Sequence, residues 1–312
     1  MNQPMVSVVV PAYNAERTVT AAVSSALQQT VSSLEVVVVD DGSRDATLET
    51  ARRIHDPRVR VVSQENRGAA AARNRGILAA TGEYVAFLDA DDLWLPRKLA
   101  RQLEVLSNHP ACQACQCGAY FVDDALSVLS VRPSRDTGRS LEEALLFENL
   151  PAFLSALIAK RSLLLEVGLF DVGLEILEEW DMAIKMARFG AMRSVPEALV
   201  LYRVHPGNRH RNVDIHIAPG FAVLEKVFGD PALPAAAKRL RRRAYATFFR
   251  TLAGGYFNNR NLLAFARWAL RSVLSDPRQL AYMLALPLRR IERRASRGAS
   301  GVPANARDLL VP

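Results

Sequence analysis

The chain has 312 residues, and because half of them are apolar it can bury one large or two modest cores without disulfide support. Its three cysteines, Cys112, Cys115 and Cys117, lie in one short stretch, which argues against a secreted disulfide framework and favours a reducing, cytoplasmic compartment. The net charge of +8 divides into −4 over residues 1–215 and +12 over residues 216–312, so we expect a first domain followed by a basic region.

The first hundred residues predict an α/β fold, because apolar runs typical of buried strands alternate with apolar residues at helical spacing. The element order β-α-β-α-β-α-β indicates a mostly parallel sheet flanked by helices. Strands are predicted at Val6–Val10, which Pro11 ends, and at Val36–Val39, Val59–Val62 and Tyr84–Leu88. Helices are predicted between these strands, including Ala69–Ala80, and after Pro96.

The remaining sequence alternates loops with helical patterns. A polar loop is predicted over residues 132–138, a helix from Glu178 through Phe189, and a loop over residues 206–212. From Ile217 onward the spacing is helical, so residues 216–312 form a helical C-terminal extension whose end, from Ser296, we expect to be flexible.

Polar residues follow three of the predicted strands at the point where each strand ends. In an open parallel sheet the ligand lies beyond the carboxyl ends of the strands, because the connecting loops meet there. This geometry brings Pro11–Asn14, Asp40–Ser43 and Asp89–Asp92 to one edge.

Three carboxylates share the last of these loops. A hard divalent cation coordinated by Asp91, and by Asp89 directly or through water, would remove the repulsion between them and bind two phosphates of a nucleotide. Alternatively, Asp89, Asp91 and Asp92 only terminate the strand and cap the helix that follows Pro96.

The neighbouring loop offers a second acidic pair. Asp40 or Asp41 can accept a hydrogen bond from a nucleobase N–H, although the same residues also suit an Asx-turn. On the predicted helix Ala69–Ala80, which lies between the two acidic loops in the sequence, Arg73 and Arg75 could neutralise a diphosphate, hold the acidic loops or remain solvated.

The cysteine stretch has two interpretations. His109, Cys112, Cys115 and Cys117 could supply the four ligands of a structural zinc ion, but their spacing is unusual and no second pair exists. Alternatively, Cys115 and Cys117 share one face of a short strand, where free thiols pack as small hydrophobes.

An ordered series of motifs resembles the family 2 inverting glycosyltransferases over roughly residues 5–207. Several motifs in one order are more specific than any of them alone. The motifs are Val6–Asn14, Val39–Ser43, Asn66–Gly68 with Asn74–Gly76, Gly82–Tyr84, Leu88–Asp92, Gly168–Asp171, Glu178–Asp181 and Tyr202–His205.

The resemblance implies the glycosyltransferase A fold and a binding site for a nucleotide-sugar. Asp41 would lie near the nucleobase, and Asp91 would be the principal ligand of Mn²⁺ or Mg²⁺. Asp89 would lie near the ribose and the metal, with His205 approaching the metal or diphosphate unless it is structural. The residues lining the nucleotide pocket would be Pro11, Ala12, Tyr13 and Asn14.

The catalytic base is implied by an acidic cluster. Where the family usually has Glu-Asp, with the Asp as base, this chain has Glu178-Glu179, so the resemblance assigns the base to Glu179, with Glu178 and Asp181 as reserves. Alternatively, the cluster only caps the helix that it begins. Arg73 and Arg203 would stabilise the leaving diphosphate.

These features predict an enzyme that transfers a sugar from a nucleoside diphosphate sugar to an acceptor hydroxyl with inversion. The resemblance favours a UDP-sugar donor, because members of the family commonly use one. We expect a saccharide or lipid-linked acceptor in cell-surface polysaccharide or glycolipid synthesis. The Glu-Glu substitution leaves open a non-catalytic nucleotide-sugar-binding scaffold. A sugar nucleotidyltransferase would need a glycine-rich loop after the first strand, and an oxidoreductase would need Gly-x-Gly-x-x-Gly; the sequence contains neither.

The basic tail adds an expected partner. The arginines at 239–243 and 289–294 flank apolar residues, which suits binding to an anionic membrane surface, although a solvated basic face has the same composition. The sequence shows no recognisable nucleic-acid-binding motif beside these basic residues, so nucleic acid is not an expected partner. Without a signal-peptide pattern or a run of about 18 apolar residues, we expect a cytoplasmic protein, peripheral on the inner face of the membrane if it binds there.

Overall fold

A computed structural model describes residues 4–134, 140–146, 154–190, 192–205, 212–285 and 305–310. The chain divides into two compact units, one comprising residues 1–140, 151–205 and 302–312 and the other residues 141–150 and 206–301. This division differs from a single boundary at residue 215, because one early segment belongs with the helical unit and the end of the chain belongs with the first. Residues 206–211 of the loop predicted at 206–212, and the arginines at 289–294, lie outside the described residues.

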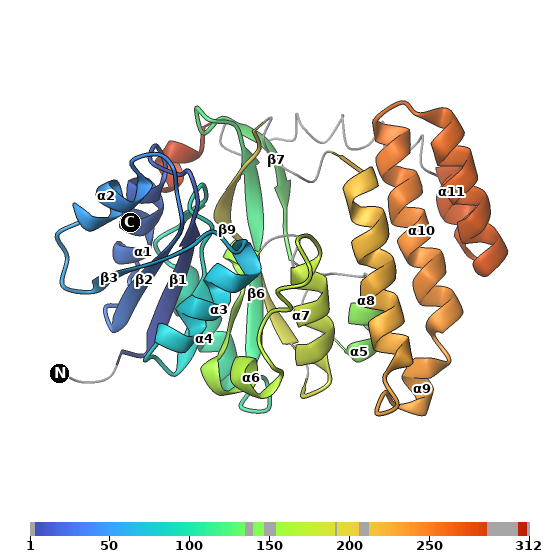
Figure 1. Cartoon of the computed structure of the whole chain (residues 1–312), viewed down its shortest axis with the longest axis horizontal. Helices are drawn as coiled ribbons and strands as arrows, with labels where there is room; N and C mark the ends of the chain where they lie inside the picture. The colour runs from blue at the N-terminus through green and yellow to red at the C-terminus, as the bar shows by residue number, and fades with distance from the viewer. Residues whose placement is uncertain are drawn as a thin grey trace. The chain divides into compact units, whose positions relative to one another are not determined.

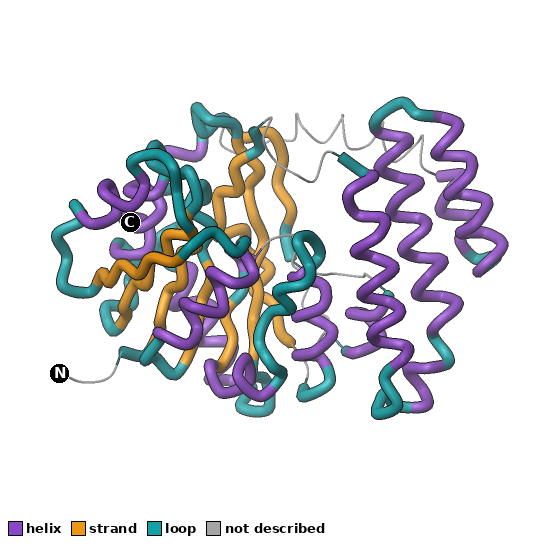
Figure 2. The backbone as a smooth tube through the Cα atoms, in the orientation of Figure 1, coloured by secondary structure: helices purple, strands orange, loops and turns teal. Residues whose placement is uncertain are grey.

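The first unit is built on a mixed sheet with the strand order β3-β2-β1-β4-β8-β6-β9-β5, and β7 pairs with β6 (Figures 1 and 2). The predicted α/β class is confirmed, and strands β1 to β4 are parallel as expected. Beyond β4 the sheet mixes directions, since β8 is antiparallel to both β4 and β6 while β6 and β9 are parallel. The strands are β1 (Val6–Ala12), β2 (Leu34–Asp41), β3 (Val59–Gln64), β4 (Tyr84–Phe87), β5 (Leu93–Trp94), β6 (Ala114–Val122), β7 (Val128–Arg132), β8 (Ile158–Lys160) and β9 (Met192–Arg203).

Strand β1 continues through Pro11, so the prediction that Pro11 ends it was wrong. The carbonyl of Val9 accepts from Leu88 N at 3.0 Å, which shows that the backbone N–H and C=O groups of Val9 point toward β4. Pro11 is two residues further along, so its backbone groups point to the same side. The ladder between β1 and β4 has ended by position 11, while Pro11 still pairs in register with Val39 of β2. The missing N–H of Pro11 therefore costs the sheet no hydrogen bond.

Helices cover both faces of this sheet. One core joins α1 (Val19–Leu27), α2 (Thr47–Arg52) and α4 (Lys98–Asn108) to the face carrying Val6, Val8 and Val10. The other core joins α3 (Ala69–Ala79), α6 (Arg161–Glu166) and α7 (Glu178–Ala187) to the face carrying Val9, Val85 and Phe87.

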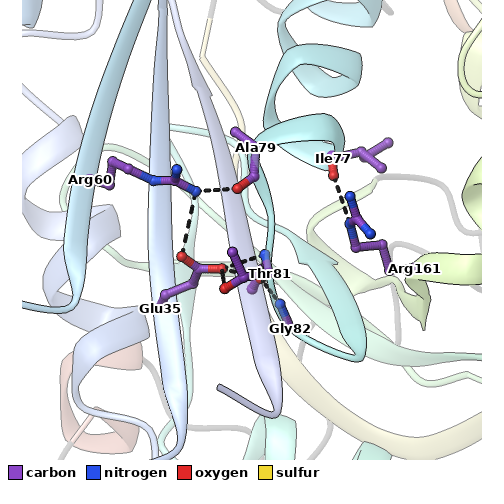
Figure 3. Close-up of polar contacts among 8 residues, drawn as sticks. Glu35, Arg60, Ile77, Ala79, Thr81, Gly82 and Arg161 are labelled. Atoms are coloured by element: carbon purple, nitrogen blue, oxygen red, sulfur yellow. Dashed lines mark hydrogen bonds and ion pairs between the residues drawn. The ribbon is translucent and has the colours of Figure 1, made fainter. Parts of the chain in front are cut away.

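Helix α3 is fixed at its C-terminal end by a polar cluster that Figure 3 shows. Glu35 accepts from the backbone N–H and the hydroxyl of Thr81, both at 2.7 Å, and forms an ion pair with Arg60. Arg60 also donates to the carbonyl of Ala79, and Arg161 donates to that of Ile77 at 3.1 Å. Arg60 and Arg161 thus satisfy carbonyls that the end of a helix leaves without partners, and they fix the position of this end of α3.

The cysteine stretch forms part of strand β6 and its approach. Cys115 and Cys117 are buried in the core on one face, which confirms that they pack as small hydrophobes, and burial raises the pKa of Cys117 to about 11. The ring of His109 lies 3.2 Å from the guanidinium of Arg193. Within the described ranges no three His, Cys, Asp or Glu side chains form a metal-holding group.

Residues 305–310 return to the first unit, contrary to the flexible terminus expected from Ser296, whereas residues 296–304 lie outside the described ranges. Asn305 bridges to Ser127, and Ala306, which is fully buried, donates to the carbonyl of Leu126 at 2.9 Å. A short 3₁₀ turn, Ala306–Leu309, follows. Apolar side chains in this segment lack helical or strand periodicity, so the sequence pattern could not reveal that they join the core.

The second unit is helical, as predicted. It contains α5 (Leu141–Leu145), η3 (Asp214–His216), α8 (Ile217–Gly229), α9 (Ala235–Lys238), α10 (Arg241–Asn258) and α11 (Leu262–Ser275), with residues 279–285 also helical. Helices α8, α10 and α11 lie side by side in Figure 1 around an aromatic core, in which Phe221 is 5.7 Å from Phe248 and 6.5 Å from Trp268 between ring centroids. None of the helices described here is both long and apolar enough to cross a bilayer.

Candidate functional site

The carboxyl ends of β1, β2 and β4 meet at one edge of the sheet, as the sequence predicted. Ala12 pairs with Asp40 across β1 and β2, and Val9 pairs with Phe87 across β1 and β4. The polar loops that follow these strands therefore begin side by side.

The loop after β1 is tied to the loop after β2. Asn14 N donates to Ser43 Oγ at 3.0 Å, and Asn14 Oδ1 accepts from Arg44 N at 2.9 Å. Ala12 is buried in the core and Pro11 is half-buried, whereas Tyr13 is 45% exposed and Asn14 is also exposed. Of the four residues expected to line a nucleotide pocket, Tyr13 and Asn14 are thus the ones whose side chains are open to a ligand.

Asp41 organises the next loop through its carboxylate. Its Oδ1 accepts from Gln64 Nε2 at 2.8 Å and from Arg67 N at 3.0 Å, and its Oδ2 accepts from Gly68 N at 2.8 Å. A carboxylate has about four acceptor positions, so these three donors leave one position on Oδ2, in a residue that is only 3% exposed. Asp41, the last residue of β2, therefore holds the segment that leads into α3.

The side chain of Arg73 joins two loops that are far apart in the sequence. Its Nη1 donates to Glu178 Oε1 and its Nη2 to Asp89 Oδ1, both at 2.8 Å, while only 7% of the side chain is exposed. Burial would lower the pKa of Arg73, but the charges of Asp89 and Glu178 outweigh it and raise it. A guanidinium fork matches two carboxylates in a fixed geometry, so Arg73 sets the distance between them.

The acidic cluster begins helix α7 after a strained residue. Leu177 adopts the left-handed conformation with φ 67° and turns the chain sharply into the helix. Burial and the charge of Glu178 raise the pKa of Glu179 to about 8, against the opposing charge of Arg73. Asp181, the other reserve candidate, forms an ion pair with Lys185 at 2.7 Å within the helix and is almost fully buried.

Ser155, which the sequence analysis did not single out, fixes the acidic loop after β4. Its Oγ accepts from Asp89 N at 3.1 Å and donates to Asp92 Oδ2 at 2.6 Å. Asp92 Oδ1 accepts from Arg203 N at 3.0 Å. Asp92 thus ties β9 to the loop, whereas the guanidinium of Arg203 donates to the carbonyl of Asp124.

The role of Asn74 was also not predicted, although Asn74 lies in one of the family motifs. It donates to the carbonyl of Phe170 and accepts from Phe170 N, both at 2.9 Å, and so positions the segment that leads to α7. Only the fold reveals either link, because Asn74 is 96 residues from its partner and Ser155 is 63 from Asp92.

Asp91 and His205 are the side chains best placed to hold a divalent cation. His205 Nε2 lies 3.1 Å from Asp91 Oδ2, and both side chains are about one third exposed. Burial and the charge of Asp89 raise the pKa of Asp91. Mg²⁺ commonly uses one or two carboxylates and takes its other ligands from water and substrate phosphates, so these residues fit such an ion.

The sequence matches a known family over half of the chain. Residues 7–164 match the model of Glycosyl transferase family 2. The succinoglycan biosynthesis protein ExoO of Rhizobium meliloti is 33% identical over 93% of this chain and 88% of its own length. The uncharacterized glycosyltransferase RT0329 of Rickettsia typhi is 31% identical over 65% of this chain, which spans 64% of that protein, less than two thirds. WfgD of Escherichia coli, a UDP-Glc:alpha-D-GlcNAc-diphosphoundecaprenol beta-1,3-glucosyltransferase, is 40% identical over 34% of this chain and 42% of its own length.

Solved structures share the fold. S. aureus TarS in complex with UDP-GlcNAc superposes with a TM-score of 0.67 at 17% identity, covering 94% of this chain and 90% of that chain. The mannosyltransferase PcManGT from Pyrobaculum calidifontis, in complex with GDP-Man and Mn²⁺, gives a TM-score of 0.59 at 22% identity, covering 93% and 88%. At these identities the likeness concerns the fold.

The two arginines of α3 provide a matched test of the bridge. Arg73→Met should lower the free energy of unfolding by about 3–5 kcal/mol, because it leaves the buried carboxylate of Glu178 and the partly buried carboxylate of Asp89 without their cation. Arg75→Met, at an exposed position of the same helix, should change it by less than about 0.5 kcal/mol. Chemical denaturation of both variants measures the difference, and equal small losses would show that the bridge contributes little.

Proposed function

Because this chain belongs to glycosyl transferase family 2, we propose that it transfers a sugar from a nucleoside diphosphate sugar to an acceptor hydroxyl, with inversion at the anomeric carbon. The observation that carries this proposal is the Arg73 bridge. It holds Asp89, at the end of β4, and Glu178, beside the candidate base, at 2.8 Å from one guanidinium. The loop that would bind the donor and the candidate base are therefore joined in one site.

The loops after β1 and β2 would hold the nucleotide. The remaining acceptor position of Asp41 would receive a nucleobase N–H, and the exposed ring of Tyr13 would lie against the base. Asp89 keeps one carboxylate oxygen beyond the one that Arg73 occupies and would face the ribose.

Asp91 and His205 would hold Mn²⁺ or Mg²⁺ together with the diphosphate of the donor. When bound, the ion would neutralise negative charge on the leaving diphosphate. The Mn²⁺ bound in PcManGT, which has the same fold, supports this assignment.

Glu179 would act as the base. A sugar hydroxyl is a poor nucleophile near neutral pH, so a carboxylate must accept its proton as the oxygen attacks the anomeric carbon. The raised pKa suits this task, because a base works best when its pKa lies near the working pH. One displacement without a protein nucleophile inverts the configuration.

A UDP-sugar is the favoured donor, and saccharide or lipid-linked hydroxyls are the favoured acceptors. TarS binds UDP-GlcNAc, and the name of WfgD specifies both UDP-Glc and a diphosphoundecaprenol acceptor. ExoO is named for succinoglycan biosynthesis, which supports a role in polysaccharide assembly.

Replacement of the base separates chemistry from binding. Glu179→Gln should reduce the slow release of UDP from a UDP-sugar, measured with Mn²⁺ and without acceptor, by about 10²–10⁴-fold. Glu179→Asp, which restores the usual family residue, should keep most of the activity. Thermal shift with UDP-sugar and Mn²⁺ should be unchanged in both variants, because neither removes a donor ligand.

Two outcomes would contradict the assignment. Unchanged UDP release in Glu179→Gln would remove Glu179 as the base. Donor-dependent stabilisation without any turnover in the unaltered protein, across UDP- and GDP-sugars and with Mn²⁺ present, would instead favour the nucleotide-sugar-binding scaffold.

The rate should depend on pH through Glu179. Below its pKa of about 8 the carboxyl holds a proton and cannot accept another, so kcat/KM for UDP release should fall about tenfold per pH unit as the pH decreases. Glu178→Gln removes the neighbouring negative charge and should therefore move this fall in kcat/KM to lower pH. Glu166→Gln, at an exposed position, should leave the profile in place; a fall in kcat/KM that stayed at the same pH in Glu178→Gln would contradict the coupling.

A further inference from the structure

Helix α11 of the second unit carries exposed leucines along one side. Leu263, Leu270 and Leu274, here called the leucine ridge, are 85%, 60% and 68% exposed. Since each residue of an α-helix turns by about 100°, they lie opposite Trp268 and Ser272, the two buried residues of α11. The helix therefore has one face in the aromatic core and an apolar face outside it.

The exposed apolar side chains are concentrated in this part of the chain. Leu262 of α11 is 64% exposed, and in the helical residues 279–285 Leu280 and Leu284 are 51% and 72% exposed. Elsewhere in the ranges described, Leu78 and Val172 are the only large apolar side chains more than half exposed. Such a local concentration marks an interaction surface, because single exposed leucines are ordinary but a series of them on one segment is not.

Positive charge lies beside the leucine ridge. Arg267 and Arg271 are exposed on the adjacent strip of α11, and the guanidinium of Arg271 lies 4.8 Å from the centroid of the Trp268 ring, which fixes its charge there. The helix contains no Asp or Glu. Apolar and cationic groups without acidic ones are the composition of a helix that lies in the interface of an anionic bilayer.

We propose that the leucine ridge docks this protein onto an anionic lipid bilayer, with α11 lying along the interface and Arg267 and Arg271 at the level of the headgroups. The leucines would leave water for the acyl boundary, and the arginines would pair with lipid phosphates. Docking extends the proposed function, since it would bring the enzyme to lipid-linked acceptors. It does not rest on that function, because binding to vesicles needs neither donor nor metal.

A second copy of the chain fits this face less well. In a two-fold dimer the same patch meets itself, so each copy would bring Arg267 and Arg271 to the same interface. With no carboxylate on α11 to pair them, the like charges would oppose association. The same charges favour a surface of lipid phosphates.

Vesicle sedimentation of the full chain tests the proposal. Phosphatidylcholine vesicles are compared with vesicles of phosphatidylcholine and phosphatidylglycerol, without nucleotide-sugar or Mn²⁺. We expect binding to the mixed vesicles that weakens as NaCl is raised. Leu270→Ser combined with Leu274→Ser should lower the partition coefficient at least tenfold, and Arg267→Gln by about fivefold.

Matched controls come from α3 of the other unit. Leu78→Ser and Arg75→Gln make the same chemical changes at exposed positions and should leave binding unchanged. Circular dichroism should show all variants folded, since none of the altered side chains is buried. Equal binding to neutral vesicles, no binding to either kind, or a dimer in light scattering that Leu270→Ser with Leu274→Ser abolishes would each overturn the proposal.

Discussion

The candidate site depends on one buried cation between two carboxylates. Arg73 reaches Asp89 and Glu178 at 2.8 Å each from a helix that is fixed at its far end and packed closely on β1. Gly76, one turn further along, has no room for a Cβ, which would lie 2.3 Å from a methyl carbon of Val9. Close packing of α3 therefore places the guanidinium where both carboxylates can meet it, and an uncompensated charge on either side would be costly.

This bridge explains how a parallel half-sheet is joined to an acidic cluster on a distant helix. The first four strands present polar loops at one edge, where sheets of this type bind their ligands. Glu178 and Glu179 come from α7, more than eighty residues after β4, and they reach the edge because Arg73, Asn74 and the left-handed Leu177 fix the approach to that helix. The same neighbours set the chemistry, since burial and the charge of Glu178 raise the pKa of Glu179.

The sequence predicted the first half of this architecture and the family, because β-branched strands, an alanine-rich helix and strand-terminal aspartates are local signals. The family motifs also brought Asp89, Asp91, Glu179 and His205 together as candidates. The second half of the sheet was not predicted, since β8 is three residues long and its pairing with β4 and β6 is decided by contacts distant in sequence. Ser155 could not be identified for the same reason: a lone serine acquires a role only when the fold places it between two aspartates of the loop after β4.

A double-mutant cycle on Asp89→Asn and Glu178→Gln tests the bridge most directly. Each single variant leaves Arg73 one carboxylate, whereas the double variant leaves a buried cation with none. The free energy of unfolding should therefore fall in the double variant by at least about 1 kcal/mol more than the sum of the two single losses. Additive losses, within about 0.5 kcal/mol, would contradict the claim that Arg73 joins the two parts of the site.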